Sequence, residues 1–261
     1  MKKIGASILL FFAFIVFLGC KKDTADPSLP VLKLSPVAVS GKSGHDTSTV
    51  LTIVAPNGVG KLVLSKTVNL VPDETFGQQT VTPENIGENT YQYTFHYVFQ
   101  DTEVNKLVGI NFHFEDTKGN VAEKDLTITT EASGAQLIYS NKWKLVSKMW
   151  TTVSPPEESL EECGKDDIYS YYKDSTIGLN YGAQPCLFDG LNIYDKWWLS
   201  EDEKTFTQVY HSVFNPAQIT TEVYTVQTLS KDKWVMSIIL DLSVFGYTDH
   251  EEFVYTFEAL D

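Results

Sequence analysis

Alternation of aromatic and polar residues with a period of two is the feature that most constrains the fold of this chain. From position 91 to 99 every odd residue is aromatic: Tyr91, Tyr93, Phe95, Tyr97 and Phe99. Successive side chains of a β-strand point to opposite faces, so this pattern predicts a strand with five rings on one side. The rings can form a platform for sugars or the buried face of a sandwich. We favour the buried face, because aliphatic residues share the same parity.

The first half of the chain reads as short strands separated by turn residues, with no extended periodicity of 3.6 residues. We predict strands at 31–37, 49–54, 61–68, 91–100, 107–115 and 123–130. This many strands in about a hundred residues is typical of an immunoglobulin-like β-sandwich. We expect that sandwich to span residues 31–131.

Two groups of residues in the first half are candidate metal ligands. The segment 112–121 resembles the Asp-x-x-Gly-Asn hairpin of bacterial immunoglobulin-like and cadherin-like domains, and it contains Asp116 and Asn120. Their oxygens can bind calcium or stabilise the turn themselves, and we favour the turn. His96 and His113 lie on polar faces, where they can be cross-strand neighbours. We expect no metal at either place.

The second half predicts a second all-β unit. Strands are expected at 143–147, 167–172, 175–181, 196–199, 205–210, 221–228, 233–242 and 251–258. Each has one apolar face, and eight antiparallel strands in sequential order fit an up-and-down barrel. The segment 131–135 breaks the strand pattern, so we place the domain boundary there and the barrel at residues 137–261.

Several motifs of the second half resemble the lipocalin-like domains of bacterial lipoproteins. They are Trp143-x-Leu145, Cys163-x-Lys165-Asp166-Asp167, Cys186, Trp197-x-Leu199 and Tyr255-x-Phe257. The resemblance implies a small barrel with an apolar cavity and a paired set of cysteines, and it assigns no ligand. The segment 154–162 and the doubled tryptophan at 197–198 depart from the family pattern.

The first twenty residues predict export and lipid attachment. Two lysines precede an uncharged run from Ile4 to Leu18, which fits a signal peptide and is short for a permanent membrane span. The run ends in Phe17-Leu18-Gly19-Cys20, which resembles a bacterial lipobox. We expect a leader of residues 1–19, a lipid on Cys20 and a flexible tether over 20–30. An ordinary secretory signal is the alternative.

The resemblance to bacterial lipoproteins also implies a location. Residue 21 is Lys and not Asp, so the signal that retains lipoproteins in the inner membrane is absent. The charged stretch at 21–23 resembles the export signals of surface lipoproteins. We therefore expect an outer-membrane lipoprotein, facing either the cell surface or the periplasm, with the membrane as one partner through its lipid.

The cysteine count predicts one disulfide. Of the three cysteines, Cys20 is assigned to lipid, which leaves Cys163 and Cys186 in an oxidising compartment. A bond between them closes a loop of about two dozen residues and stabilises the fold by about 3 kcal/mol. A two-cysteine metal site is the alternative. We favour the disulfide, because no histidine lies near either cysteine in the sequence.

Composition excludes several classes of protein. Hydrophobic residues make up 43% of the chain and aromatic residues 13%, which allows a packed core. The formal charge of −14 becomes −16 without the two lysines of the leader, and the chain contains no arginine. An acidic chain without guanidinium groups is a poor candidate for binding nucleic acid, nucleotides or anionic lipid.

The sequence contains none of the catalytic motifs that we sought. A Gly-x-Ser-x-Gly elbow, a His-Glu-x-x-His zinc motif and a Gly-x-Gly-x-x-Gly loop are all missing. Asp166 and Asp167 are adjacent carboxylates, but neighbours on a strand point to opposite faces and do not form an acid–base pair. We predict a protein that is not an enzyme and has no cofactor.

Trp197 and Trp198 are the best candidates for ligand contact. On a strand one indole faces inward and the other outward, and the outward one can lie beside Tyr171 or Tyr172 and stack on a sugar. Burial of both indoles is the alternative. We predict a lipid-anchored binding module for a glycan or a small apolar ligand. A structural or adhesive surface protein is the second hypothesis, and a glycan-directed hydrolase the third.

The barrel interior separates these hypotheses. An interior filled by Trp143, Trp234, Met236 and Phe257 would argue against a ligand inside the barrel. An open pocket of a few hundred Å³ would support one.

Overall fold

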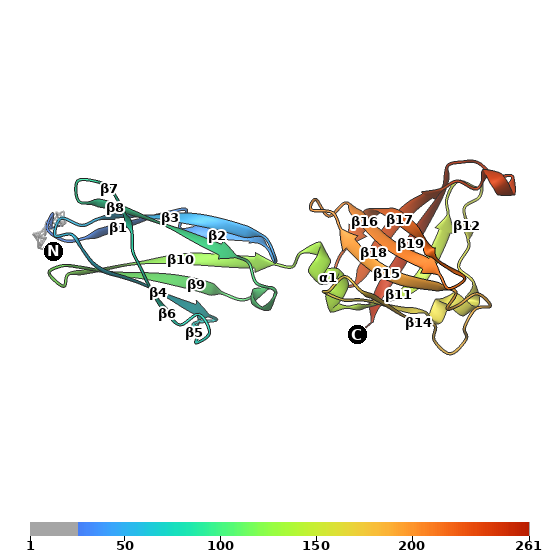
Figure 1. The fold of residues 1–261 in the computed structure, drawn as a ribbon, viewed down its shortest axis with the longest axis horizontal. Coiled ribbons are helices and arrows are strands. Elements are labelled where there is room, and N and C mark those ends of the chain that lie inside the picture. Colours follow the sequence, from blue (N-terminus) through green and yellow to red (C-terminus); the bar gives the residue numbers. More distant parts are fainter. Residues whose placement is uncertain (1–25, 261) are drawn as a thin grey trace, which may run out of the picture.

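The computed structural model describes residues 26–260 and is almost entirely β-structure, arranged as a sandwich followed by a barrel (Figure 1). The all-β fold class is therefore confirmed. The predicted leader, Cys20 and most of the predicted tether lie outside the described residues. Within 26–260, no helix is long and apolar enough to cross a membrane.

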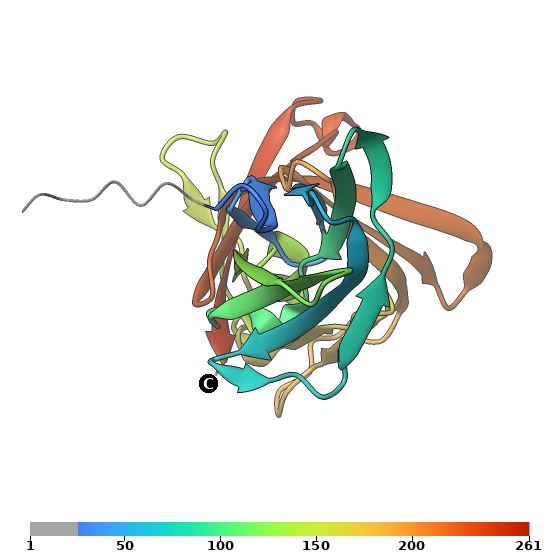
Figure 2. The ribbon, with the colours of Figure 1, turned by 90° about the vertical axis from the view of Figure 1, so that its left-hand side faces the viewer.

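The sandwich consists of two sheets that face each other, as Figure 2 shows from the free end of this unit. One sheet has the order β1(Val31–Ser35), β3(Asp46–Val54), β8(Thr90–Val98), β7(Glu84–Gly87). The other has the order β2(Ala38–Lys42), β10(Val121–Glu131), β9(Val108–Asp116), β4(Val59–Val68), β5(Val71–Pro72), and β6(Gln78–Val81) also pairs with β4. This order is that of an immunoglobulin domain whose first strand is divided between the sheets.

The division of the first strand corrects the prediction of one strand at 31–37. β1 ends at Ser35, and the chain then crosses to the other sheet, where β2 pairs in parallel with β10. Pro36 lies at the crossing and has no N–H to give to a ladder, which is why the first strand stops there. Sequence alternation alone does not detect such a change of sheet.

The aromatic face of β8 lies in the sandwich core, as favoured above. Phe95, Tyr97 and Phe99 are buried, while Tyr91 and Tyr93 are half-buried at the other end of the strand. The rings of Phe95 and Phe112 meet edge to face at 5.8 Å across the two sheets. Rings held this way stabilise the core and are not a platform for sugars.

The structure does not bring the two histidines of this unit together. His96 belongs to β8 in the first sheet and His113 to β9 in the second, so they are not cross-strand neighbours. His113 Nδ1 instead lies 2.7 Å from a carboxylate oxygen of Glu123 on β10.

Asp116 accepts four hydrogen bonds, three from its own turn and one from Asn57 in the turn between β3 and β4. Its Oδ1 accepts from the backbone N–H groups of Lys118 and Asn120, each at 2.9 Å. Its Oδ2 accepts from the side-chain amides of Asn57 at 2.9 Å and Asn120 at 2.8 Å. Burial by itself raises the pKa of Asp116, but the hydrogen bonds outweigh it and the pKa falls below its usual value. Stabilisation of the turn therefore explains Asp116 and Asn120 without a calcium ion.

A cluster of buried charged residues joins β4 to the segment between β8 and β9. Lys66 on β4 pairs with Glu103 in η1(Asp101–Glu103) and, at 3.2 Å, with Asp73. Glu103 also accepts a hydrogen bond from the hydroxyl of Tyr97. The side chains of Lys66 and Glu103 are 8% and 4% exposed, so these charges depend on each other for stabilisation.

The barrel is a meander whose eight principal strands occur in sequential order. They are β11(Lys142–Trp150), β13(Ile168–Tyr171), β14(Ile177–Asn180), β15(Asn192–Leu199), β16(Thr205–Ser212), β17(Asn215–Leu229), β18(Lys233–Leu240) and β19(Glu251–Leu260). The short β12(Glu157–Glu158) pairs with β11. β19 pairs with β11, and β14 and β15 are the two ends of the sheet, so the barrel is nearly closed. The predicted antiparallel barrel is confirmed.

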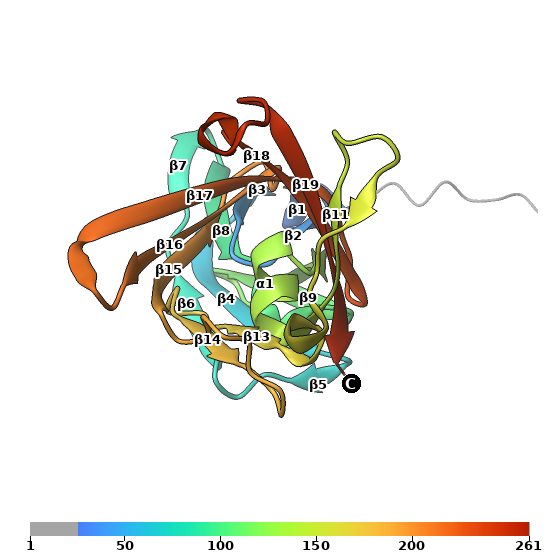
Figure 3. The same ribbon diagram turned by 90° about the vertical axis from the view of Figure 1, so that its right-hand side faces the viewer.

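One end of the barrel is closed by a helix and by aromatic packing. The helix α1(Gly134–Ser140) lies across this end, as the end-on view in Figure 3 shows. The indole N–H of Trp143 donates to the carbonyl of Ile138 in α1 at 2.9 Å. Trp143, Phe206 and Trp234 are fully buried next to it, with ring centroids 5.6 Å and 4.8 Å apart in the two contacts of Trp234. This half of the interior is solid.

The closed end of the barrel faces the sandwich. Strand β10 leads directly into α1 (Figure 1), and the hydroxyl of Ser43 donates to the side chain of Gln136 at 2.7 Å. The hydroxyl of Tyr139 donates to Asp101 at 2.6 Å. The opposite, open end of the barrel therefore faces away from the sandwich.

Candidate ligand-binding site

The disulfide predicted from the cysteine count is present. Cys163 in η2(Glu162–Asp166) is bonded to Cys186 in the loop between β14 and β15, with their Cα atoms 5.3 Å apart. The metal alternative is wrong for this pair, because the two sulfurs are bonded to each other and neither is a thiolate. The bond ties two loops together at the open end of the barrel.

The two predicted aromatic pairs alternate between core and surface. Trp197 and Tyr171 are 4% and 2% exposed, and their rings contact each other at 5.6 Å inside the barrel. Trp198 and Tyr172 are 47% and 52% exposed and point outward. Trp197 also joins the two ends of the sheet, since its backbone N–H donates to Ser175 and its indole to the carbonyl of Tyr172.

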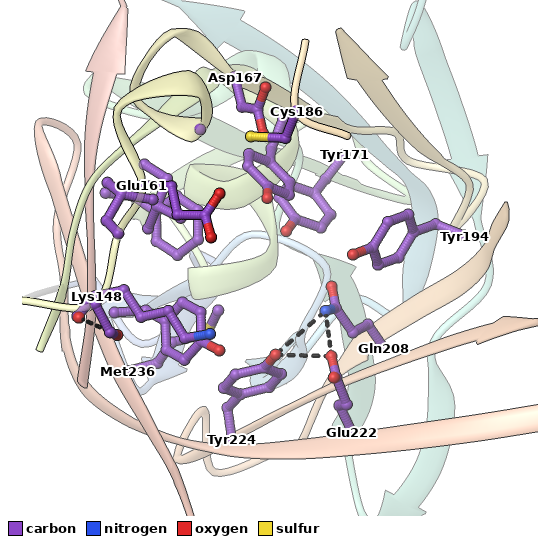
Figure 4. Close-up of a pocket in the computed structure, with 17 residues that line it drawn as sticks. Lys148, Glu161, Asp167, Tyr171, Cys186, Tyr194, Gln208, Glu222, Tyr224 and Met236 are labelled. Atoms are coloured by element: carbon purple, nitrogen blue, oxygen red, sulfur yellow. Dashed lines mark hydrogen bonds between the residues drawn. The ribbon is translucent and has the colours of Figure 1, made fainter. Parts of the chain in front are cut away.

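The open half of the barrel contains a cavity of about 370 Å³, which we call the cup (Figure 4). Five tyrosines line it: Tyr169, Tyr171, Tyr194, Tyr224 and Tyr255. Its other polar lining residues include Lys148, Glu161, Asp167, Gln208 and Glu222. Met236 and Phe257 are buried at its base, above the tryptophans. A filled interior and an open pocket therefore both occur, at different levels of the barrel.

Two β-bulges direct side chains into the cup. Trp143 and Leu145 face inward, and strict alternation would continue with Ser147. The register between β11 and β19 shifts at Val146, however, and the next residue to face inward is Lys148. Bulges redirect side chains in this way and are frequent beside functional sites.

The second bulge acts on β15. The register with β16 shifts at Asp195, so Tyr194 and Trp197, an odd number of residues apart, both face the interior. The sequence gives no sign of either bulge, and periodicity reasoning therefore missed Lys148 and Tyr194.

Glu222 on β17 is held by three donors in the wall of the cup. Its carboxylate accepts from the side-chain amide of Gln208 at 2.7 Å and from the hydroxyls of Tyr224 at 2.7 Å and Tyr210 at 3.4 Å. The first two of these side chains surround the carboxylate in Figure 4. The carbonyl oxygen of Gln208 is buried without a hydrogen-bond partner among the described residues.

The cup tyrosines remain protonated at physiological pH. Burial raises the pKa of Tyr169, Tyr194 and Tyr255 far above the usual value, and nearby carboxylates act in the same direction. Each therefore offers a hydroxyl donor together with a ring face. Burial lowers the pKa of Lys148, while Glu222 and Glu161 oppose that shift.

Asp167 is the least satisfied charged group of the cup. It directly follows η2, is 7% exposed, and its Oδ1 is buried without a hydrogen-bond partner among the described residues. Burial first, and then repulsion by Asp189 and Asp166, raises the pKa of Asp167 to about 6. The adjacent Asp166 has another role: its Oδ2 accepts from the backbone N–H groups of Ala183 and Gln184. The two carboxyl groups thus have different surroundings, but neither residue lies on a strand, contrary to what the prediction from alternating faces assumed.

The histidines of residues 26–260 show no arrangement for nucleophilic catalysis. Those that make side-chain hydrogen bonds, His113, His211 and His250, contact carboxylates. None contacts a serine or cysteine as a catalytic base would. The described histidines therefore give no indication of a catalytic base for a nucleophile.

Three loops that connect strands at the end of the barrel opposite α1 each carry an exposed phenylalanine. Phe188 lies between β14 and β15, Phe214 between β16 and β17, and Phe245 in η3(Ser243–Phe245) between β18 and β19. They are 72%, 80% and 74% exposed. Because strand direction alternates in a meander, each of these loops follows a strand that runs away from α1, and the β16–β17 hairpin extends to one side of the barrel (Figure 3). We call the three residues the rim.

Comparison with known proteins does not identify the chain. No protein-family model and no curated protein matches it. Among solved structures, a DUF4466 family protein from Parabacteroides merdae is 10% identical with a TM-score of 0.29, and the match covers 88% of this chain and 98% of that one. Spo0M, a sporulation control protein from Bacillus subtilis, is 10% identical with a TM-score of 0.28, covering 88% and 89%. TM-scores this low support no conclusion on fold or function.

Proposed function

We propose that this chain is a non-catalytic binding protein of the bacterial cell envelope, anchored by lipid on Cys20, and that the cup binds a glycan. The observation that carries the proposal is a cup of about 370 Å³ lined by five tyrosines. Ligand sites are commonly concave and largely pre-formed, and this volume lies in their usual range. A tyrosine offers both a ring face and a hydroxyl, which suits the apolar and polar sides of a sugar.

The polar side chains that line the cup favour a glycan over a small apolar molecule as the ligand. Lys148, Asp167, Gln208 and Glu222 all reach the cavity surface. An apolar ligand would displace water from these groups without replacing its hydrogen bonds, which is costly. A polyhydroxylated ligand replaces them.

The arrangement of the two units suits a surface receptor. The described chain begins at the end of the sandwich far from the barrel (Figure 1). A lipid on Cys20 would therefore leave the sandwich as a spacer, with the cup and the rim directed away from the membrane. The lipobox-like sequence at 17–20 supports the anchor.

The anchor can be tested separately from the cup. We expect mass spectrometry of the membrane-extracted protein to find residues 1–19 removed and a diacylglycerol on Cys20. Replacement C20A should abolish lipid attachment. An unmodified Cys20 in the mature chain would refute the anchor and leave the binding proposal standing.

Binding is tested with the soluble chain lacking residues 1–20 on a glycan array, followed by calorimetry on any hit. Tyr194→Ala removes a ring from the cup, while Tyr172→Ala removes an exposed ring outside it and is the matched control. We expect Y194A alone to weaken binding at least tenfold. Absence of binding to every glycan would refute the proposal and favour a structural or adhesive protein. Shorter products from a bound glycan would indicate a hydrolase.

A further inference from the structure

The cup contains more acidic than basic groups. Glu161 and Asp167 come from the disulfide-linked turn, and Glu222 comes from the opposite wall. Lys148 is the one basic residue among the lining side chains. Figure 4 shows the side chains of Glu161, Lys148 and Tyr194 directed toward the same central space. A ligand that enters this space therefore meets a surplus of carboxylate oxygens.

The carboxyl group of Asp167 indicates which chemical group of a ligand the cup would bind. Asp167 lines the cup and is 7% exposed as a residue, and its carboxylate accepts no hydrogen bond from the described residues. The carbonyl oxygen of Gln208 lacks a donor as well. A carboxylate without donors destabilises the empty site, and a ligand N–H that reaches this carboxylate from the cup lowers that cost.

The ammonium group of Lys148 lies against ring faces in the wall of the cup. The Nζ atom of Lys148 lies 5.2 Å from the ring centre of Phe253 and 5.4 Å from that of Tyr255. It has no ion-pair partner in the part of the chain that the structure describes. Aromatic faces attract cations when water is excluded, and tyrosine is effective in this role. A second cation would find further tyrosine faces together with unpaired acceptors.

We infer that the cup selects sugars with a free, protonated amino group, held by the carboxylate of Asp167 and by tyrosine ring faces. The inference rests on the proposed glycan-binding function and names the ligand class. An ammonium group donates several hydrogen bonds, and its positive charge compensates the excess of negative carboxylates in the cup. N-acetylation of the amino group removes the charge and adds bulk, so acetylated sugars bind more weakly.

The inference is tested by calorimetry at pH 6.5 with three β-1,4-linked tetrasaccharides, made of glucosamine, N-acetylglucosamine or glucose. The glucosamine tetramer should bind at least tenfold more tightly than the other two. Asp167→Asn keeps the shape of the side chain and removes the charge, and it should reduce that preference about tenfold. Glu201→Gln, at an exposed position on the turn between β15 and β16, removes a charge far from the cup and should change nothing.

The possible outcomes separate the inference from the proposed function. Equal binding of all three tetramers, or an unchanged preference in D167N, overturns the inference and leaves glycan binding intact. If none of the three tetramers binds but another glycan binds on the array, the inference is likewise overturned and glycan binding stands. Absence of binding throughout overturns both. Because D167N removes a buried charge, it should fold at least as well as the parent chain, and a loss of preference will not reflect unfolding.

Discussion

The buried cluster around Lys66 gives the sharpest prediction for the stability of the sandwich. Lys66→Met removes the cation and leaves the carboxylate of Glu103, whose side chain is 4% exposed, with only the hydroxyl of Tyr97 as a donor. Removing one member of a buried ion pair typically costs about 3–5 kcal/mol. We expect K66M to lower the free energy of unfolding of the sandwich by this amount.

Removing the carboxylate of Glu103 instead of the cation should cost less free energy of unfolding. In Glu103→Gln, Lys66 retains Asp73 as a second carboxylate at 3.2 Å, so its charge is still compensated. A loss of about 1–2 kcal/mol is expected, as for a weakened hydrogen bond to a charged group. In the double variant K66M/E103L the most deeply buried carboxylate is removed together with the cation, and Asp73 keeps Thr75 and Phe76 as donors. The cost should return to about 1–2 kcal/mol, because Tyr97 loses its acceptor.

The distribution of tryptophan provides the assay. All five tryptophans lie between positions 143 and 234, in the barrel. Urea unfolding monitored by tryptophan fluorescence therefore reports the barrel, while hydrogen exchange in peptides from β4 and β9 reports the sandwich. K66M should reduce the protection from hydrogen exchange in the β4 and β9 peptides and leave the fluorescence-detected unfolding midpoint unchanged. Equal losses in K66M and E103Q, or a double variant as unstable as the sum of both, would refute this account of the cluster.

Three further predictions concern the barrel. Because the pKa of Asp167 is raised to about 6, the folded state holds a proton that the unfolded state has lost between pH 4 and pH 6, and stability falls as pH rises through this window. D167N should therefore raise stability by about 1–3 kcal/mol at pH 7.5 and by little at pH 4, as thermal unfolding at both pH values will show. Replacing Cys163 and Cys186 by serine opens a loop with a sequence separation of 23 and should cost the barrel about 3 kcal/mol, measured by urea unfolding; an unchanged midpoint would contradict this. Trp197→Ala should cost about 3–5 kcal/mol and Trp198→Ala less than about 1 kcal/mol, since only the first indole is buried, and similar losses would argue against the inward placement of Trp197.

Much of the fold follows from local sequence patterns. The alternation of Phe95 and Tyr97 with polar residues fixes which face of β8 is buried, because period two is a property of the strand backbone itself. The eight principal barrel strands lie close to their predicted ranges for the same reason. The pairing of Cys163 with Cys186 followed from a count in which the third cysteine was assigned to lipid.

The site depends on features that no local pattern encodes. The bulges at Val146 and Asp195 arise where the curvature of the barrel changes the register between strands, and they alone bring Lys148 and Tyr194 into the cup. The burial of Asp167 likewise depends on a turn and a loop joined by a disulfide across the open end.

The sequence by itself thus determined the eight principal barrel strands, their sequential order and the one disulfide, since these depend on the spacing of residues along the chain. Only the tertiary structure decided that the barrel is solid beside Trp143 and hollow beside Tyr194. That outcome depends on the summed volume of side chains from all strands at each level, and on which acceptors are left without donors, as at Asp167. Packing volume and hydrogen-bond satisfaction are properties of the assembled barrel.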